Sequence, residues 1–422
     1  MKIRRLEANE RYLANLCQII AFEGNMDIQK AREECMAMTE EEIEKDRGAQ
    51  SCVPPFLPSD PFPAIKRWAA LTDDESAIQG CLNVNTYTAR FDGHLVLMGG
   101  IGGVATLPQY RRSGCIRSCI AAALQDMYDS GYAFSFLYPF SRAYYRKFGF
   151  EDGSRSFTWT IQMDAIASKP APGTIRQLLP GDSLEPLVQI YNRCFQDYNL
   201  SIVRKEYNPK IHLEELLSQQ RYVYVWFDES GEPRGFFISK KNDKREMDCT
   251  ATFASRNDFL AESPQALEAM LLFIKSAFSS DYDAIKFITP EYISPELLLP
   301  ECNKMSAVMQ LNGMARIINV QKVLKLCRCH GNGTLCIAVS DNMLPHNNGT
   351  WKLSFAEGKE NQVEITTDSP DITLSIQTLT SLICGIRSYR EIPYLKDAVI
   401  HHPQAPLERV FYNKPCYVLD LF

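Results

Sequence analysis

The stretch LPQYRRSGCIR, residues 107–117, gathers three arginines around a single glycine at the expected start of a helix. From Cys115 to Tyr128 the apolar residues recur at the spacing of a helix that packs one face on a sheet, and Gly131 marks its expected end. A helix N-terminus carries about half a positive charge, so arginines in the first turn are unfavourable unless an anion binds there. The stretch therefore predicts an anion-binding loop between a strand and a helix.

Three kinds of anion loop can be compared with this region. The spacing of a dinucleotide fingerprint is present in GGIGGVA, residues 99–105, but that fingerprint needs its glycines between a strand and a helix, and Pro108 would interrupt a helix at once. No G-x-x-x-x-G-K-[ST] string exists, which excludes a P-loop. In a pyrophosphate loop, backbone N–H groups around Arg112 to Arg117 would face the anion, and Gly114 would allow its close approach. A solvated basic helix start is the alternative.

The 422 residues carry a net charge of −6, and 45% of them are hydrophobic. At ~150 residues per domain, the chain can form two to four packed domains. The acidic balance excludes bulk electrostatic binding to nucleic acid or to an anionic membrane. The N-terminal stretch MKIRRLEANERYLANL lacks the apolar core of a signal peptide, and no window approaches the ~18 apolar residues of a membrane span. We expect a cytoplasmic protein that binds neither nucleic acid nor membrane.

The 14 cysteines are scattered through apolar segments rather than grouped. Cys115 and Cys119 fall on the helix face that is expected to be buried, and reduced core thiols fit this distribution better than disulfides do. The densest group, CRCHG at residues 327–331, lacks the paired C-x-x-C spacing of a structural zinc site. A turn or strand end is expected there, and no metal.

An internal repeat divides the first 300 residues. KIRRL at residues 2–6 is echoed by TIRQL at 174–178, and LCQI at 16–19 by LVQI at 187–190, with nearly equal offsets of 172 and 171 residues. Each pair predicts the start of a strand followed about a dozen residues later by an apolar helix, which indicates two copies of one unit. The second copy has no arginine-glycine pair in residues 249–263, so it is expected to keep the scaffold without the anion loop.

Strand and helix patterns predict mixed sheets with helices packed on them, an α+β fold. The predicted elements comprise a hairpin around RFDG at 90–93, a strand at 133–139, a helix from Ser141, a hairpin at 221–241 and a helix at 264–278. SKPAPG at 168–173 has the composition of a linker. After Pro300 a third α+β pattern follows, with strands near 334–341, 349–355 and 362–368 and a helix near 379–385.

The R-R-x-G loop, the following amphipathic helix and YYRKFGF at 144–150 resemble the GNAT acetyltransferases. The order of the whole chain, with VATLPQYRRSGCIR, FSRAYYRKFGFE and a sterol-carrier-like segment LCIAVSDNMLPHNNGTWKL, resembles the enhanced intracellular survival (Eis) family. This resemblance implies two GNAT-like mixed-sheet domains, at 1–153 and, without the loop, at 154–298. It implies a sterol-carrier-like α+β domain at 299–422.

The resemblance also implies acetyl-CoA as cosubstrate. Its pantetheine arm would lie along Val104, Ala105 and Thr106, where backbone groups can pair with amides as an added strand does. Phe140 and Ser141 would lie beside its pyrophosphate. The loop residues that would hold the pyrophosphate are Arg111, Arg112, Ser113, Gly114, Cys115, Ile116 and Arg117.

Acetyl transfer to an amine needs a proton acceptor and a proton for the departing thiolate. By resemblance, Tyr145 is the general acid, with Tyr144 as its rival; the alternative is that both rings only pack under the sheet. The family's base is the C-terminal carboxylate, here that of Phe422. CYVLDLF, residues 416–422, independently predicts an apolar strand running to the last residue and burying it, which would raise the carboxylate's pKa. An ordinary edge strand is the alternative.

Together these residues predict an N-acetyltransferase acting on a primary amine of an aminoglycoside-like molecule, a polyamine or a lysine side chain. An acidic residue expected next to the chain end in some relatives is absent, which leaves the preferred charge of the acceptor open. A closed homo-oligomer, a hexamer or trimer if family-like, is expected. The alternative is a non-catalytic protein on the same fold that binds coenzyme A or a lipid.

Overall fold

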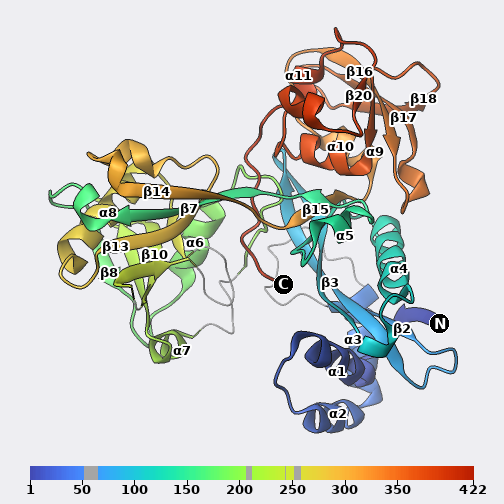
Figure 1. The fold of residues 1–422 in the computed structure, drawn as a ribbon, viewed down its shortest axis with the longest axis horizontal. Coiled ribbons are helices and arrows are strands. Elements are labelled where there is room, and N and C mark those ends of the chain that lie inside the picture. Colours follow the sequence, from blue (N-terminus) through green and yellow to red (C-terminus); the bar gives the residue numbers. More distant parts are fainter. Residues whose placement is uncertain (52–64, 206–211, 243, 251–257) are drawn as a thin grey trace.

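A computed structural model describes residues 1–51, 65–205, 212–242, 244–250 and 258–422. Within these residues the strands form three sheets, which Figure 1 shows as three lobes. The strand orders are β1-β2-β3-β4-β5-β15-β6, then β14-β7-β13-β11-β10-β9-β8 with β12 paired to β10, then β18-β17-β16-β19-β20. No helix among the described residues is both long and apolar enough to cross a membrane.

The first sheet contains the predicted hairpin and the predicted anion loop. Asp92 and Gly93 turn the hairpin with positive φ angles of 48° and 89°, which two-residue hairpin turns favour. Helix α4 begins at Cys115, as the periodicity predicts, and buries its apolar stripe on the sheet. The elements are β1 (Lys2–Arg5), α1 (Arg11–Phe22), α2 (Ile28–Met36), α3 (Glu40–Ser51), β2 (Ile65–Leu71), β3 (Ile78–Phe91), β4 (His94–Thr106), α4 (Cys115–Asp129), β5 (Phe134–Leu137), α5 (Arg142–Arg146) and β6 (Glu151–Asp152).

The second sheet repeats the beginning of the first. Strand β8 pairs antiparallel with β9 at one edge, as β1 pairs with β2, and helix α6 follows as α1 follows β1. Part of the stretch predicted to lack the anion loop, residues 251–257, lies outside the described residues. The elements are β7 (Arg155–Gln162), β8 (Thr174–Gln177), α6 (Glu185–Cys194), α7 (Leu213–Ser218), β9 (Arg221–Phe227), β10 (Pro233–Lys241), β11 (Glu246–Cys249), β12 (Phe259–Ala261), α8 (Pro264–Phe278) and β13 (Ala284–Pro290).

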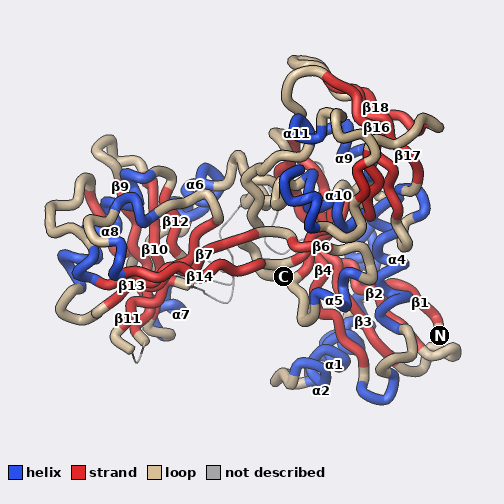
Figure 2. The backbone as a smooth tube through the Cα atoms, turned by 45° about the horizontal axis from the view of Figure 1, so that its top comes forward, coloured by secondary structure: helices blue, strands red, loops and turns tan. Residues whose placement is uncertain are grey.

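Two later strands tie the sheets together. Strand β14 (Met305–Leu311) pairs with β7 in the second sheet, and β15 (Met314–Ile317) inserts between β5 and β6 in the first. Figure 2 shows β7 and β14 running side by side from the second lobe toward the first. The predicted boundary at residue 299 remains a prediction, but two strands beyond it belong to sheets on its other side.

The third sheet packs helices α9 and α10 and carries the predicted strands and helix. It is joined to the first unit by a buried ion pair between Arg316 on β15 and Asp341. The elements are α9 (Val320–Leu326), β16 (Gly333–Ser340), β17 (Gly349–Phe355), β18 (Gln362–Thr366), β19 (Ile372–Ser375), α10 (Ile376–Ile383), β20 (Val399–Ile400) and α11 (Leu407–Val410).

Candidate active site

A gap opens in the first sheet where β4 and β5 part. The two strands pair in parallel only from Met98 to Ile101, because β5 ends at Leu137 while β4 continues to Thr106. A bulge at Gly103, which has a φ of 57°, shifts the register of β4 against β3 at this point. Beyond the bulge, Ala105 and Thr106 pair with β3 on one side, and the stretch Val104–Thr106 has no paired strand on the other side within the described residues.

The predicted anion loop closes one end of this gap. Gly114 precedes α4 with a φ of 90°, and Arg112 also takes the left-handed conformation, with a φ of 69°. The first amides of a helix have no intrahelical acceptor, and those of Cys115, Ile116 and Arg117 meet no acceptor in the part of the chain that the structure describes. These amides and the helix dipole form a site for an anion.

The three arginines of the loop are free to meet that anion. Arg111, Arg112 and Arg117 are exposed and form no ion pair with a described residue. Cys115 and Ile116 bury their side chains in the core under the helix, so only their backbone can serve the site. The loop is thus a cluster of uncompensated positive charge.

Helix α5 holds the predicted acid at the other side of the gap. Tyr145 is 3% exposed, its ring packs at the edges of the rings of Phe140, Tyr144 and Phe150, and its hydroxyl bonds to no described residue. Burial raises the pKa of Tyr145, with a smaller contribution from Tyr144, so the phenol stays protonated at neutral pH. Burial also raises the pKa of the half-buried Tyr144.

Two residues expected beside the cofactor have different environments. Phe140 is 75% exposed and its ring contacts those of Tyr144 and Tyr145. Ser141 caps α5, because its Oγ accepts a hydrogen bond from the Tyr144 amide at 3.3 Å. The serine hydroxyl therefore orients the helix that carries the tyrosines.

The C-terminal segment differs from its predicted form. It is not a strand: residues 415–422 form single bridges rather than a ladder, and the bridge between Asn199 and Cys416 is isolated from the sheets. Side chains anchor the segment instead. Asp420 receives hydrogen bonds from Arg204 at 2.8 Å and from the Tyr191 hydroxyl at 2.9 Å, and both donors are buried. Edge-strand pairing is replaced by a buried ion pair.

The anchored segment places Phe422 where β4 and β5 part, and Figure 1 shows the C-terminus between the first two lobes. The half-buried Phe422 ring lies 5.3 Å from the Tyr87 ring and 5.6 Å from the Tyr138 ring, between centroids. A Cβ built on Gly102 would lie 2.8 Å from the carbonyl carbon of Phe422, and one on Gly100 would lie 2.7 Å from its ring. Gly102 is the first β4 residue beyond the pairing with β5.

The structure therefore brings the predicted site residues to one region. Sequence reasoning did not identify the glycines of β4 that leave room for Phe422. The glycines of residues 99–103 lie inside β4 and not between a strand and a helix, as a dinucleotide fingerprint would require, and two of them make room for Phe422. Several glycines within a strand pattern indicate that another segment or a ligand approaches the strand closely, and this signal could have predicted the contact with Phe422. No group of three or more His, Cys, Asp or Glu side chains in the described ranges is arranged to hold a metal.

Two family models match separate parts of the chain. A model described as an acetyltransferase (GNAT) domain matches residues 59–153, and one described as a sterol carrier protein domain matches residues 320–412. No curated protein matches the chain. The first unit thus carries a GNAT acetyltransferase domain, the domain of a class of acyltransferases, and the third unit carries a sterol-carrier-like domain.

Solved structures resemble the chain over its full length. A probable N-acyltransferase of unknown function from Enterococcus faecalis has a TM-score of 0.80 at 20% identity, covering 100% of this chain and 99% of that chain. A GCN5-related N-acetyltransferase from Anabaena variabilis has a TM-score of 0.73 at 21% identity, covering 100% of both chains. Eis1 from Mycobacterium abscessus has a TM-score of 0.74 at 18% identity, covering 99% and 98%. The predicted fold class is confirmed.

Proposed function

We propose that this protein transfers an acetyl group from acetyl-CoA to a primary amine, as a member of the Eis family. The observation that supports this best is the gap beside Val104–Thr106, which has the arginine loop at one end and the Phe422 carboxyl at the other. The fold alone does not imply a reaction, because function resides in the site. In this protein the gap has a site for an anion at one end and a carboxylate at the other.

The residues present suit acetyl-CoA. The pyrophosphate would meet the amides of Cys115 to Arg117 and the free guanidinium groups of the loop. The unpaired side of Val104–Thr106 would accept the amides of the pantetheine arm as an added strand. The bound thioester supplies the activated acetyl group.

In the proposed mechanism the Phe422 carboxylate accepts the proton of the attacking amine, directly or through a water molecule. Tyr145 then donates its phenolic proton to the departing thiolate; the raised pKa of Tyr145 keeps the phenol protonated until the thiolate forms. Tyr144, the residue before Tyr145 in α5, is the alternative donor. Acetyl-CoA chemistry fits the cytoplasmic location that the sequence predicts.

A panel of amines tests the function. We expect thiol release from acetyl-CoA with at least one of a polyamine, an aminoglycoside and a lysine peptide, since the site provides both an acid and a base. The panel includes amines of different charge because Asp420 is paired with Arg204 and adds no free negative charge beside the acceptor. Coenzyme A binding without turnover of any amine would favour the non-catalytic alternative.

Substitutions in the loop test the cofactor site. Arg112→Ala should weaken coenzyme A binding by about 1.5–3 kcal/mol, the scale of a charge-assisted hydrogen bond. Gly114→Val should abolish it, because a side chain there would stand between the helix amides and the pyrophosphate. Isothermal titration calorimetry measures both. Gly181→Val is the matched control, since Gly181 has a φ of 94° and, like Gly114, open space around its Cβ position. Unchanged coenzyme A affinity in both loop variants would show that the loop is a solvated helix start and not a pyrophosphate site.

We propose further that the protein is a closed homo-oligomer, because symmetric closure leaves no open association surface. Light scattering should give a multiple of the 48.0 kDa chain mass, a trimer or hexamer if it follows the family. A mass of one chain at assay concentration would refute this assembly and would leave the catalytic proposal standing.

A further inference from the structure

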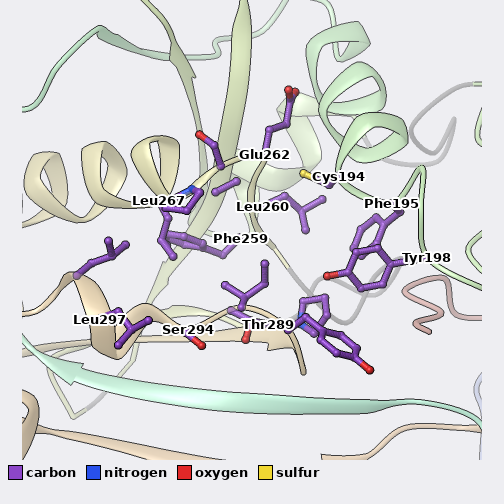
Figure 3. A pocket seen from close by; sticks show the side chains of 17 residues that line it. Cys194, Phe195, Tyr198, Phe259, Leu260, Glu262, Leu267, Thr289, Ser294 and Leu297 are labelled. Carbon is purple, nitrogen blue, oxygen red and sulfur yellow. The ribbon is translucent and has the colours of Figure 1, made fainter. Parts of the chain in front are cut away.

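The second unit contains a cavity of about 440 Å³ that the proposed function does not use. It is bordered by the end of β12, the first turn of α8, the end of β13 and the 3-10 turn at Pro295–Leu298, as Figure 3 shows. In the first unit the corresponding order is β4, α4, β5 and α5. By this order the cavity occupies the place that the proposed cofactor gap occupies in the first unit.

We propose that this cavity binds an uncharged aromatic small molecule, independently of any acetyl transfer in the first unit. The chemistry of the lining decides the class of ligand. Most of the lining side chains are apolar, and four of them carry aromatic rings. These four are Phe195, Tyr198, Phe259 and Tyr292.

No free charge among the described lining residues could hold a phosphate. Glu262 is the one ionised side chain among the lining residues, and it is paired with Arg193 at 2.6 Å and with Arg234 at 3.1 Å. Figure 3 shows its carboxylate pointing away from the labelled apolar side chains. Both arginines are therefore engaged, and a charged ligand would lose its hydration without gaining a free counter-ion.

Two of the five hydroxyls of the described lining accept hydrogen bonds from within the protein. Ser263 Oγ accepts a hydrogen bond from the Ala266 amide at 3.1 Å, and Thr289 Oγ1 accepts one from Trp159 Nε1 at 2.8 Å. The hydroxyl of Tyr198 bonds to no described residue, and in Figure 3 it points toward the interior of the cavity. Burial raises the pKa of Tyr198, so this hydroxyl remains a donor. The ligand should therefore carry at least one hydrogen-bond acceptor.

The size and rim of the cavity fit a molecule of two or three rings. Its volume is about three times that of a ~150 Å³ cavity that holds one benzene, and within the ~300–1,000 Å³ range of small-molecule sites. At the rim, Leu297 is 81% exposed and Tyr292 is 45% exposed. A bound aromatic molecule would cover this apolar surface.

The test uses the neutral probe N-phenyl-1-naphthylamine, which fluoresces in apolar sites, titrated onto the full chain with coenzyme A at saturation. We expect one saturable site that coenzyme A does not displace. Ser294→Trp should weaken binding at least tenfold by filling the cavity, because Ser294 lines it and its side chain makes no capping hydrogen bond. Leu297→Arg should weaken it by placing a charge at the rim.

Matched controls separate this site from other apolar surfaces. Ser279→Trp makes the same change at the opposite end of α8, and Leu179→Arg makes the same change at an exposed leucine outside the lining. Both should bind the probe like the unsubstituted protein, and all variants should keep its thermal midpoint. Equal binding by Ser294→Trp, or no saturable binding at all, would overturn the proposal; neither result would bear on acetyl transfer.

Discussion

One glycine added after Phe422 should lower kcat by about 10²- to 10⁴-fold, the contribution of a positioned acid or base. The added residue would move the carboxylate by up to ~3.6 Å, beyond hydrogen-bond reach of its present position. Coenzyme A affinity and the thermal midpoint should stay unchanged, because Asp420 and the Phe422 ring keep their contacts. Intact-mass spectrometry first checks that the purified chain ends at Phe422.

The control for this extension is a glycine added before Met1, which should leave kcat unchanged. Gly102→Ala gives a second measurement with the chain end intact, because its methyl group would push against the Phe422 carboxyl. Tyr145→Phe should also lower kcat, since it removes the phenolic proton and keeps the ring packing. Normal turnover by the extended enzyme would show that Phe422 is not the base, and the base would then be sought among the carboxylates of the first unit.

The second large effect concerns stability. Asp341→Asn should lower the free energy of unfolding by about 3–5 kcal/mol, the usual loss when one partner of a buried ion pair is removed. Arg316 and Asp341 have fully buried side chains, joined at 2.6 and 2.7 Å. The Arg316 guanidinium also donates to the Phe148 carbonyl, three residues beyond Tyr145. The substitution leaves that cation buried without a counter-charge.

Unfolding the protein with a denaturant, while following a spectroscopic signal from the third unit, measures this loss. Asp368→Asn is the control, because its pair with Lys352 is exposed and should contribute little. The double variant Arg316→Met with Asp341→Asn should be more stable than Asp341→Asn alone, since it removes the unpaired cation. Equal stability of the single and double variants would contradict an electrostatic origin.

The same pair gives stability a defined pH dependence. Burial alone would raise the pKa of Asp341, but the charge and hydrogen bonds of Arg316 outweigh it and hold the pKa below its ordinary value. A carboxylate with a lowered folded-state pKa contributes stability above its unfolded pKa of ~3.9 and loses it as the pH falls through the folded value. The contribution of Asp341 should therefore be constant near neutral pH and disappear in acid below about pH 4.

The sequence by itself determined the local elements and the chemistry of the loop. Helix α8 spans the predicted residues 264–278, α4 begins at the predicted Cys115, and the hairpin turns at Asp92 and Gly93. Each depends on hydrogen bonds and apolar periodicity within a few residues, which a short window of sequence contains. The arginine cluster before a helix likewise required only local residues for its prediction.

Tertiary structure alone decided which distant segments meet. Strand β15 enters the first sheet between β5 and β6, although its residues follow the second unit, because strand pairing depends on backbone groups that every residue carries. The segment ending at Phe422 was predicted as a strand, yet it is held by the Arg204–Asp420 pair, 216 residues apart. A buried ion pair, and glycines that leave room for another segment, require partners from separate parts of the chain, so only the folded molecule could place the backbone of Phe422 beside Gly102.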